Sequence, residues 1–130
     1  MSEIPLRVAS NAALIKDLVA LKLKDEFVGK VKKPTFEQCE PRDLRGYTFT
    51  AKARAFINGK PQTLVVTLGV NVIDLEQGTI QLYSVDEHKP LLERHKPSEG
   101  KEVRWDVVGV KNGVPRQFWR GTLEVFHGVA

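Results

Sequence analysis

The chain has 130 residues, of which 42% are hydrophobic and 28% charged, and its formal net charge is +4. This suits one folded domain with a core and excludes a disordered tail. No apolar run approaches the roughly 18–20 residues of a membrane span, and no basic head precedes an unbroken apolar stretch as in a signal peptide. The single Cys39 cannot form an intrachain disulfide, so nothing demands an oxidising compartment.

The N-terminal residues 1–13 are small, polar and weakly patterned, so we expect an arm outside a single β-sandwich domain of residues 14–130. Further along, Gly29 and Pro34 interrupt the pattern. They flank the only dense basic cluster, which consists of Lys30, Lys32 and Lys33. This cluster lacks the interleaved aromatic residues of a single-strand nucleic-acid binder. We therefore expect a solvated loop or a lysine-protected edge strand there, and no nucleic-acid partner.

Residues 14–28 fit two structures. A helix capped by Ser10 or Asn11 would place near one face Leu14, Leu18, Leu21 and Val28. A strand is indicated by the alternation with polar residues of Val19, Leu21 and Leu23. We favour the strand because Asp25 and Glu26 would lie unfavourably near a helix C-terminus.

From residue 46 onward the hydrophobic period is two, which predicts strands at 47–54, 62–70, 79–84, 102–110 and 116–126. Asn58-Gly59 and Asn112-Gly113 predict tight hairpin turns, and Asp86 is expected to cap a short helical turn. Short strands at this spacing are typical of an antiparallel β-sandwich, with a closed barrel as the alternative. The inward faces predict a core of Leu44, Tyr47, Phe49, Leu64, Val66, Ile80, Leu82, Val103, Trp105, Val107, Leu123 and Val125.

Catalytic and metal-binding patterns are missing from the sequence. His88, His95 and His127 lack ligand spacing, so we interpret them as surface histidines on loops. The acids do not follow the order of a calcium loop, and no glycine-rich phosphate loop precedes a helix. Trp105 and Trp119 are expected to pack in the core. We therefore predict no enzymatic activity, no metal and no cofactor.

Several short motifs occur in a specific order. Asp43-Leu44-x-Gly46-Tyr47 precedes a strand that ends at Arg54, followed by "DLEQGTIQL", "SVDEHKPLL" and a last hairpin, "VRWDVVGVKNGVPRQFWRGTLEV". Over residues 42–126 this order resembles the immunoglobulin-like structural modules of tailed bacteriophages, such as the baseplate upper protein group. The resemblance implies an immunoglobulin-like sandwich whose fold depends on Asp43, Leu44, Gly46, Tyr47, Trp105 and Gly121.

The same resemblance implies a non-enzymatic virion protein of the tail, baseplate, neck or fibre attachment, present in many copies and docked on other virion proteins. A capsid decoration protein of the same fold is one alternative. A carbohydrate-binding module is another, with Tyr83, Phe118 and Trp119 as its candidate aromatic residues. The expected partner-binding residues are Ile4, Leu6, Val8, Lys30, Lys32 and Lys33. We expect neither a membrane nor a nucleic acid as a partner.

Overall fold

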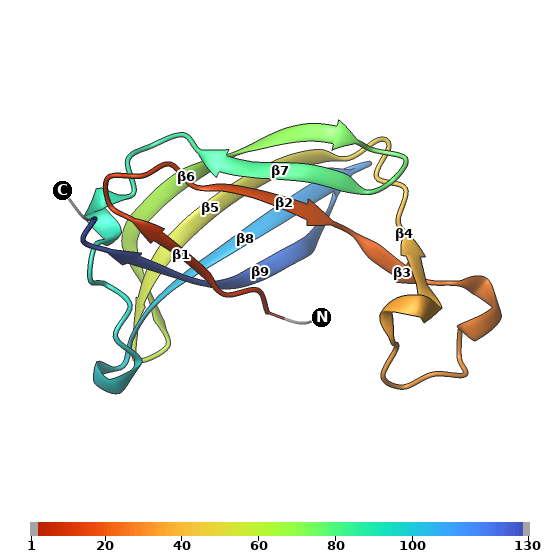
Figure 1. The fold of residues 1–130 in the computed structure, drawn as a ribbon, viewed down its shortest axis with the longest axis horizontal. Coiled ribbons are helices and arrows are strands. Elements are labelled where there is room, and N and C mark those ends of the chain that lie inside the picture. Colours follow the sequence, from red (N-terminus) through yellow and green to blue (C-terminus); the bar gives the residue numbers. More distant parts are fainter. Residues whose placement is uncertain (1–2, 129–130) are drawn as a thin grey trace.

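Figure 1 shows the computed structural model of the chain, which describes residues 3–128. Strands dominate it, and its helical segments are 3-10 turns of three residues. The strands are β1 (Leu6–Ala9), β2 (Ile15–Val19), β3 (Leu21–Leu23), β4 (Cys39–Pro41), β5 (Thr48–Ile57), β6 (Lys60–Asp74), β7 (Thr79–Ser84), β8 (Lys101–Lys111) and β9 (Val114–Phe126). The turns are η1 (Asp25–Phe27), η2 (Phe36–Gln38), η3 (Lys89–Leu91) and η4 (Pro97–Glu99).

Seven strands form one curled sheet in the order β1-β9-β8-β5-β6-β7-β2. Neighbouring strands run antiparallel, except that β1 runs parallel to β9. The all-β prediction is confirmed. The strands are hydrogen-bonded into one sheet, however, and do not form the two separate sheets that a simple sandwich would show. The sheet curls so that its two edge strands, β1 and β2, fold back across its inner face (Figure 1).

The local predictions for the two hairpin turns are confirmed. Asn58 and Gly59 both have positive φ angles, 50° and 79°, and Asn112 and Gly113 have 53° and 75°. Positive φ at both central residues is the geometry whose twist matches that of the flanking strands. Asn and Gly tolerate this region better than other residues, which explains why these dipeptides mark the turns.

The strand interpretation of residues 14–28 is confirmed for the part that β2 and β3 occupy, residues 15–19 and 21–23. Asp25 and Glu26 lie in the turn η1 that follows. A helical turn occurs at η3 as expected, but Asp86 does not cap it. The Asp86 carboxylate instead accepts a hydrogen bond from the backbone N–H of Thr67, at 3.2 Å.

Inward-facing side chains of the curled sheet form one core. Of the predicted core residues, nine are buried, while Tyr47, Phe49 and Leu64 are half-buried and pack against its margin. Trp105 is 1% exposed and lies opposite Ala53 of the neighbouring strand β5. The small side chains on the inner face of β5 leave room for the indole, as close packing in protein interiors requires.

The prediction that residues 1–13 form an arm outside the domain is wrong for Leu6–Ala9, which form β1. Leu6 pairs with Leu123 and Val8 with Val125, and these two N-terminal side chains are only 7% and 6% exposed. The folded domain therefore includes β1, and its boundary does not lie at residue 13. Two alternating apolar residues are too short a pattern to distinguish a strand from an arm, whereas in the structure they complete the core.

Candidate functional site: a projecting ribbon and the surfaces beside it

The corner before β5 is held by charged side chains. The Asp43 carboxylate accepts a hydrogen bond from the backbone N–H of Arg45 at 2.9 Å and pairs with its guanidinium at 2.6 Å. Arg45 also lies 3.3 Å from Glu76. The side-chain hydrogen bond from Arg45 lowers the pKa of Asp43 from 3.8 to about 2. Leu44, which lies between Asp43 and Arg45 in the chain, is fully buried. The corner therefore has a structural role: its charged side chains hold the turn and its leucine packs in the core.

At two positions of the candidate fold-defining set, the local geometry explains why the residue is glycine. Gly46 has φ +89°, a backbone angle that side chains with a Cβ resist. Gly121 lies beneath the backbone of Ile4, where a Cβ would overlap the Ile4 carbonyl. The close neighbour of Gly121 is therefore the backbone of the segment that precedes β1. Ile4 is also tied to the sheet, because its N–H donates to the carbonyl of Arg120 at 2.9 Å.

Residues 21–41 form a ribbon that stands away from the curled sheet (Figure 1). Its two strands, β3 and β4, pair only with each other among the described residues. Lys22 and Glu40 form an ion pair across it at 3.4 Å, and the Lys24 N–H donates to the carbonyl of Gln38 at 2.9 Å. At its far end, the Thr35 N–H donates to the Gln38 side chain at 2.9 Å. The ribbon is thus ordered by its own contacts.

No side chain of residues 21–41 is buried. Phe36 is 79% exposed and Val28 61% exposed, both at the far end of the ribbon. The predicted basic cluster lies between them, and Lys30, Lys32 and Lys33 are all exposed. The segment 28–35 contains these three lysines and no acidic residue. The far end of the ribbon therefore presents apolar and cationic side chains together.

The ribbon is anchored firmly where it leaves the sheet. The Ala20 N–H donates to the carbonyl of Gly78 at 2.8 Å, and the Arg42 N–H donates to the carbonyl of Ala20 at 2.8 Å. A Cβ on Gly78 would lie 2.8 Å from the Ala20 carbonyl oxygen and 2.5 Å from that of Arg42. Gly78 therefore allows both ends of the ribbon to cross close above the β6–β7 turn. This root fixes the direction in which the ribbon projects.

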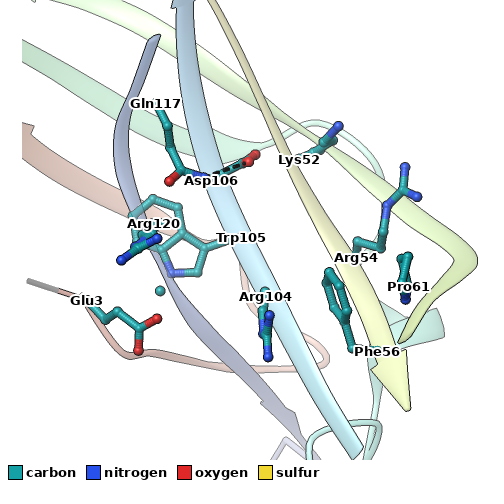
Figure 2. Close-up of a pocket in the computed structure, with 11 residues that line it drawn as sticks. Glu3, Lys52, Arg54, Phe56, Pro61, Arg104, Trp105, Asp106, Gln117 and Arg120 are labelled. Carbon is teal, nitrogen blue, oxygen red and sulfur yellow. Dashed lines mark hydrogen bonds between the residues drawn. The ribbon is translucent and has the colours of Figure 1, made fainter. Parts of the chain in front are cut away.

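The outer face of the sheet carries a hollow of about 370 Å³, shown in Figure 2. Lys52 and Arg54 of β5, Arg104 of β8 and Arg120 of β9 surround it. Arg104 lies 4.6 Å from the centre of the Phe56 ring and pairs with Glu102 at 2.7 Å. These groups sit on an open sheet face and include no nucleophile beside a base. Glu3 and Asp106 also line the hollow, so it carries charges of both signs.

The histidines are placed differently from the prediction that all three lie on the surface. His88 is 7% exposed, and its Nε2 donates to the carbonyl of Ala9 at 2.9 Å. His88 therefore holds the end of β1, and the surface interpretation is wrong for this residue. His95 is half-buried and accepts a hydrogen bond from the Val103 N–H at 3.3 Å. Within residues 3–128, no three His, Cys, Asp or Glu side chains gather as metal ligands do.

The aromatic candidates for carbohydrate stacking are not free. Phe118 is 4% and Trp119 5% exposed, and they pack with Tyr47 and Phe49. Tyr83 is half-buried and its ring covers Gly69 of the neighbouring strand. None of these three rings presents an open face of the kind that a sugar ring stacks on.

Sequence reasoning missed Phe36 as a candidate docking residue, although a signal was present. Its neighbours at the period-two positions are Pro34 and Gln38, so Phe36 has no apolar partner on any strand face. An isolated aromatic residue between turn residues indicates an exposed side chain.

Comparisons of the chain with protein-family models and with curated proteins found no match. In the described part of the chain, no helix has the length and apolar character needed to cross a membrane.

Proposed function

We propose that the protein is a non-enzymatic structural component of a bacteriophage virion that docks on neighbouring virion proteins through the ribbon of residues 21–41. The observation that carries the proposal is the far end of this ribbon, where Phe36 and Val28 remain 79% and 61% exposed. The virion setting comes from the sequence motifs of residues 42–126.

Without a partner, an exposed ribbon of this kind has little stability of its own and leaves apolar side chains in water. Isolated two-stranded hairpins are marginally stable in water, and large exposed apolar side chains mark interaction sites. Burying Phe36 against a neighbour would stabilise the complex by about 1.5–3 kcal/mol, the range for a fully buried side chain of this size. The ribbon thus combines a rigid root, its own hydrogen bonds and an uncovered apolar tip.

The lysines support the same role. Lys30, Lys32 and Lys33 lie between Val28 and Phe36 in a segment, residues 28–35, that contains no acidic residue and is flanked by Asp25, Glu26 and Glu37. Such a surface favours an acidic partner, because complementary charges raise association rates and exclude wrong neighbours. The expected partner surface is therefore an apolar depression with an acidic rim.

The proposal is tested with a double variant, Phe36→Ser and Val28→Ser, compared with Val114→Ser. Val114 is also 65% exposed but lies at the β8–β9 turn, outside the ribbon segment 21–41. We expect the double variant to disappear from purified virions, while Val114→Ser is incorporated like the wild type. Quantitative mass spectrometry of virions measures the copy number.

Two outcomes contradict the proposal. Absence of the wild-type protein from purified virions would refute the virion setting. Full incorporation of the double variant would show that the ribbon tip is not the attachment surface.

A further inference from the structure

A seam separates the two edges of the curled sheet. At one edge, β2 pairs only with β7 among the described strands. At the other, the hydrogen bond from Ile4 and the pairing of β1 cover β9 from Arg120 to Phe126. The preceding β9 residues, 115–119, have no strand on that side in the described structure. Two unpaired strand edges thus border the same gap.

The backbone of β2 is oriented to accept another strand. Ala20 donates to Gly78 of the β6–β7 turn, and the Ser84 N–H donates to the carbonyl of Leu14. Because hydrogen-bonding direction alternates along a strand, the N–H and C=O groups of Ile15, Asp17 and Val19 point away from β7. The Val19 carbonyl confirms this direction, since it accepts a bond from Trp119 Nε1 across the seam at 3.3 Å.

The seam also has an apolar floor. It contains a hollow of about 460 Å³ lined by side chains that include Leu18, Ala20, Phe118 and Trp119. An extended segment laid along β2 would direct alternate side chains onto this floor. The seam therefore offers both main-chain hydrogen bonds and side-chain burial, which are the two elements of recognition by strand addition.

Cations without acidic partners border the hollow. Lys16, Arg42 and Arg116 line it, and within residues 3–128 none has an acidic side chain within ion-pair distance. Burial, and then the nearby charge of Arg116, lower the pKa of Arg42. Asp17 also lines the hollow, and its carboxylate accepts a hydrogen bond from the Gln81 side chain at 3.2 Å. Arg42 and Arg116 have no acidic partner of their own, and these two like charges favour an incoming carboxylate.

We infer that the seam between β2 and β9 binds an extended acidic segment of a partner protein as an added β-strand. Its backbone pairs with Ile15, Asp17 and the N–H of Val19, while the Val19 carbonyl keeps its hydrogen bond from Trp119. Its apolar side chains cover Phe118 and Trp119, and its carboxylates meet Arg42 and Arg116. This surface is separate from the ribbon tip, so the inference does not depend on the ribbon's role.

The probes are three capped octapeptides. One alternates glutamate with valine, the second alternates lysine with valine, and the third has consecutive prolines between two terminal glutamates, so that neither of its edges keeps the N–H donors of the ladder. A thymidine octanucleotide tests for a general polyanion site. We expect only the glutamate–valine peptide to bind, with shifted and exchange-protected amide signals at Ile15, Asp17 and Val19 in NMR spectra.

A double variant, Arg42→Gln and Arg116→Gln, should weaken this binding at least about tenfold, as loss of charge-assisted hydrogen bonds predicts. Arg54→Gln, on the outer face, should leave it unchanged. The inference is overturned if no peptide binds at 1 mM, the upper end of about 1 μM–1 mM for weak complexes. Equal binding of the proline peptide or of the oligonucleotide would also overturn it, because neither forms a strand.

Discussion

The indole nitrogen of Trp105 donates a hydrogen bond to the carbonyl oxygen of Ile4 at 3.0 Å, which joins a central strand to the N-terminal segment. Gly121, the register partner of Trp105, leaves the space through which Ile4 passes. Together they attach the start of the chain to the core. The N-terminal segment is therefore part of the fold, and we assign the proposed docking role to the ribbon instead.

Gly121→Ala should destabilise the protein by about 1–3 kcal/mol, because the added methyl group overlaps the Ile4 carbonyl and forces the segment to shift. Urea unfolding measures the change. Thr50→Ala, on the exposed face of β5, is the matched control and should cost less than about 1 kcal/mol. Equal effects of the two substitutions would mean that the backbone of Ile4 does not pass over Gly121.

Leu6→Ala should lower the free energy of unfolding by about 2–5 kcal/mol, since its side chain is 7% exposed within the core. Arg7→Ala on the same strand is the control. Arg7 makes an exposed ion pair with Glu124, and such pairs contribute only about 0–1 kcal/mol. If Leu6→Ala lowered the free energy of unfolding as little as Arg7→Ala does, β1 would be the peripheral arm that its sequence suggests.

The Asp43 carboxyl should titrate near pH 2, well below its ordinary pKa of 3.8. Because the folded-state pKa is the lower one, its stabilising contribution is complete above about pH 4 and is lost as the pH falls toward 2. NMR of the Asp43 carboxyl carbon measures the midpoint. Arg45→Gln should raise the midpoint toward 3.8. An unchanged midpoint in this variant would assign the shift to another cause.

Chelator treatment should leave the melting temperature unchanged, because no ligand cluster forms within residues 3–128. Calorimetry before and after treatment measures this. A fall of several degrees would reveal a structural metal, since an ion that binds only the folded state stabilises it.

The strand pairs were predictable wherever several signals agreed. Between Tyr47 and Phe126 the period of two continues for many residues, and Asn-Gly turns fix the hairpins. β1 was not predictable, because its two core residues make a pattern too short to read alone. Its position depends on pairing with a strand more than a hundred residues away.

The candidate site was predictable only in part. The lysine cluster identified an exposed loop, and the isolation of Phe36 between Pro34 and Gln38 was a signal of its exposure, but Val28 carries no pattern that shows where it lies. Only the structure shows that the loop is the tip of a ribbon with a rigid root at Gly78. The seam depends on which strand edges remain unpaired, a property of the assembled sheet that no local stretch of sequence encodes.

The most direct test of the docking account replaces residues 23–39 with an Asn-Gly turn, so that the root of the ribbon remains closed. The replaced segment contains no buried side chain, so the free energy of unfolding should change by less than about 1 kcal/mol. The measurement is the copy number of this variant in purified virions, relative to the wild type. The account predicts that the variant folds but is absent from virions. Wild-type copy number in virions would contradict it.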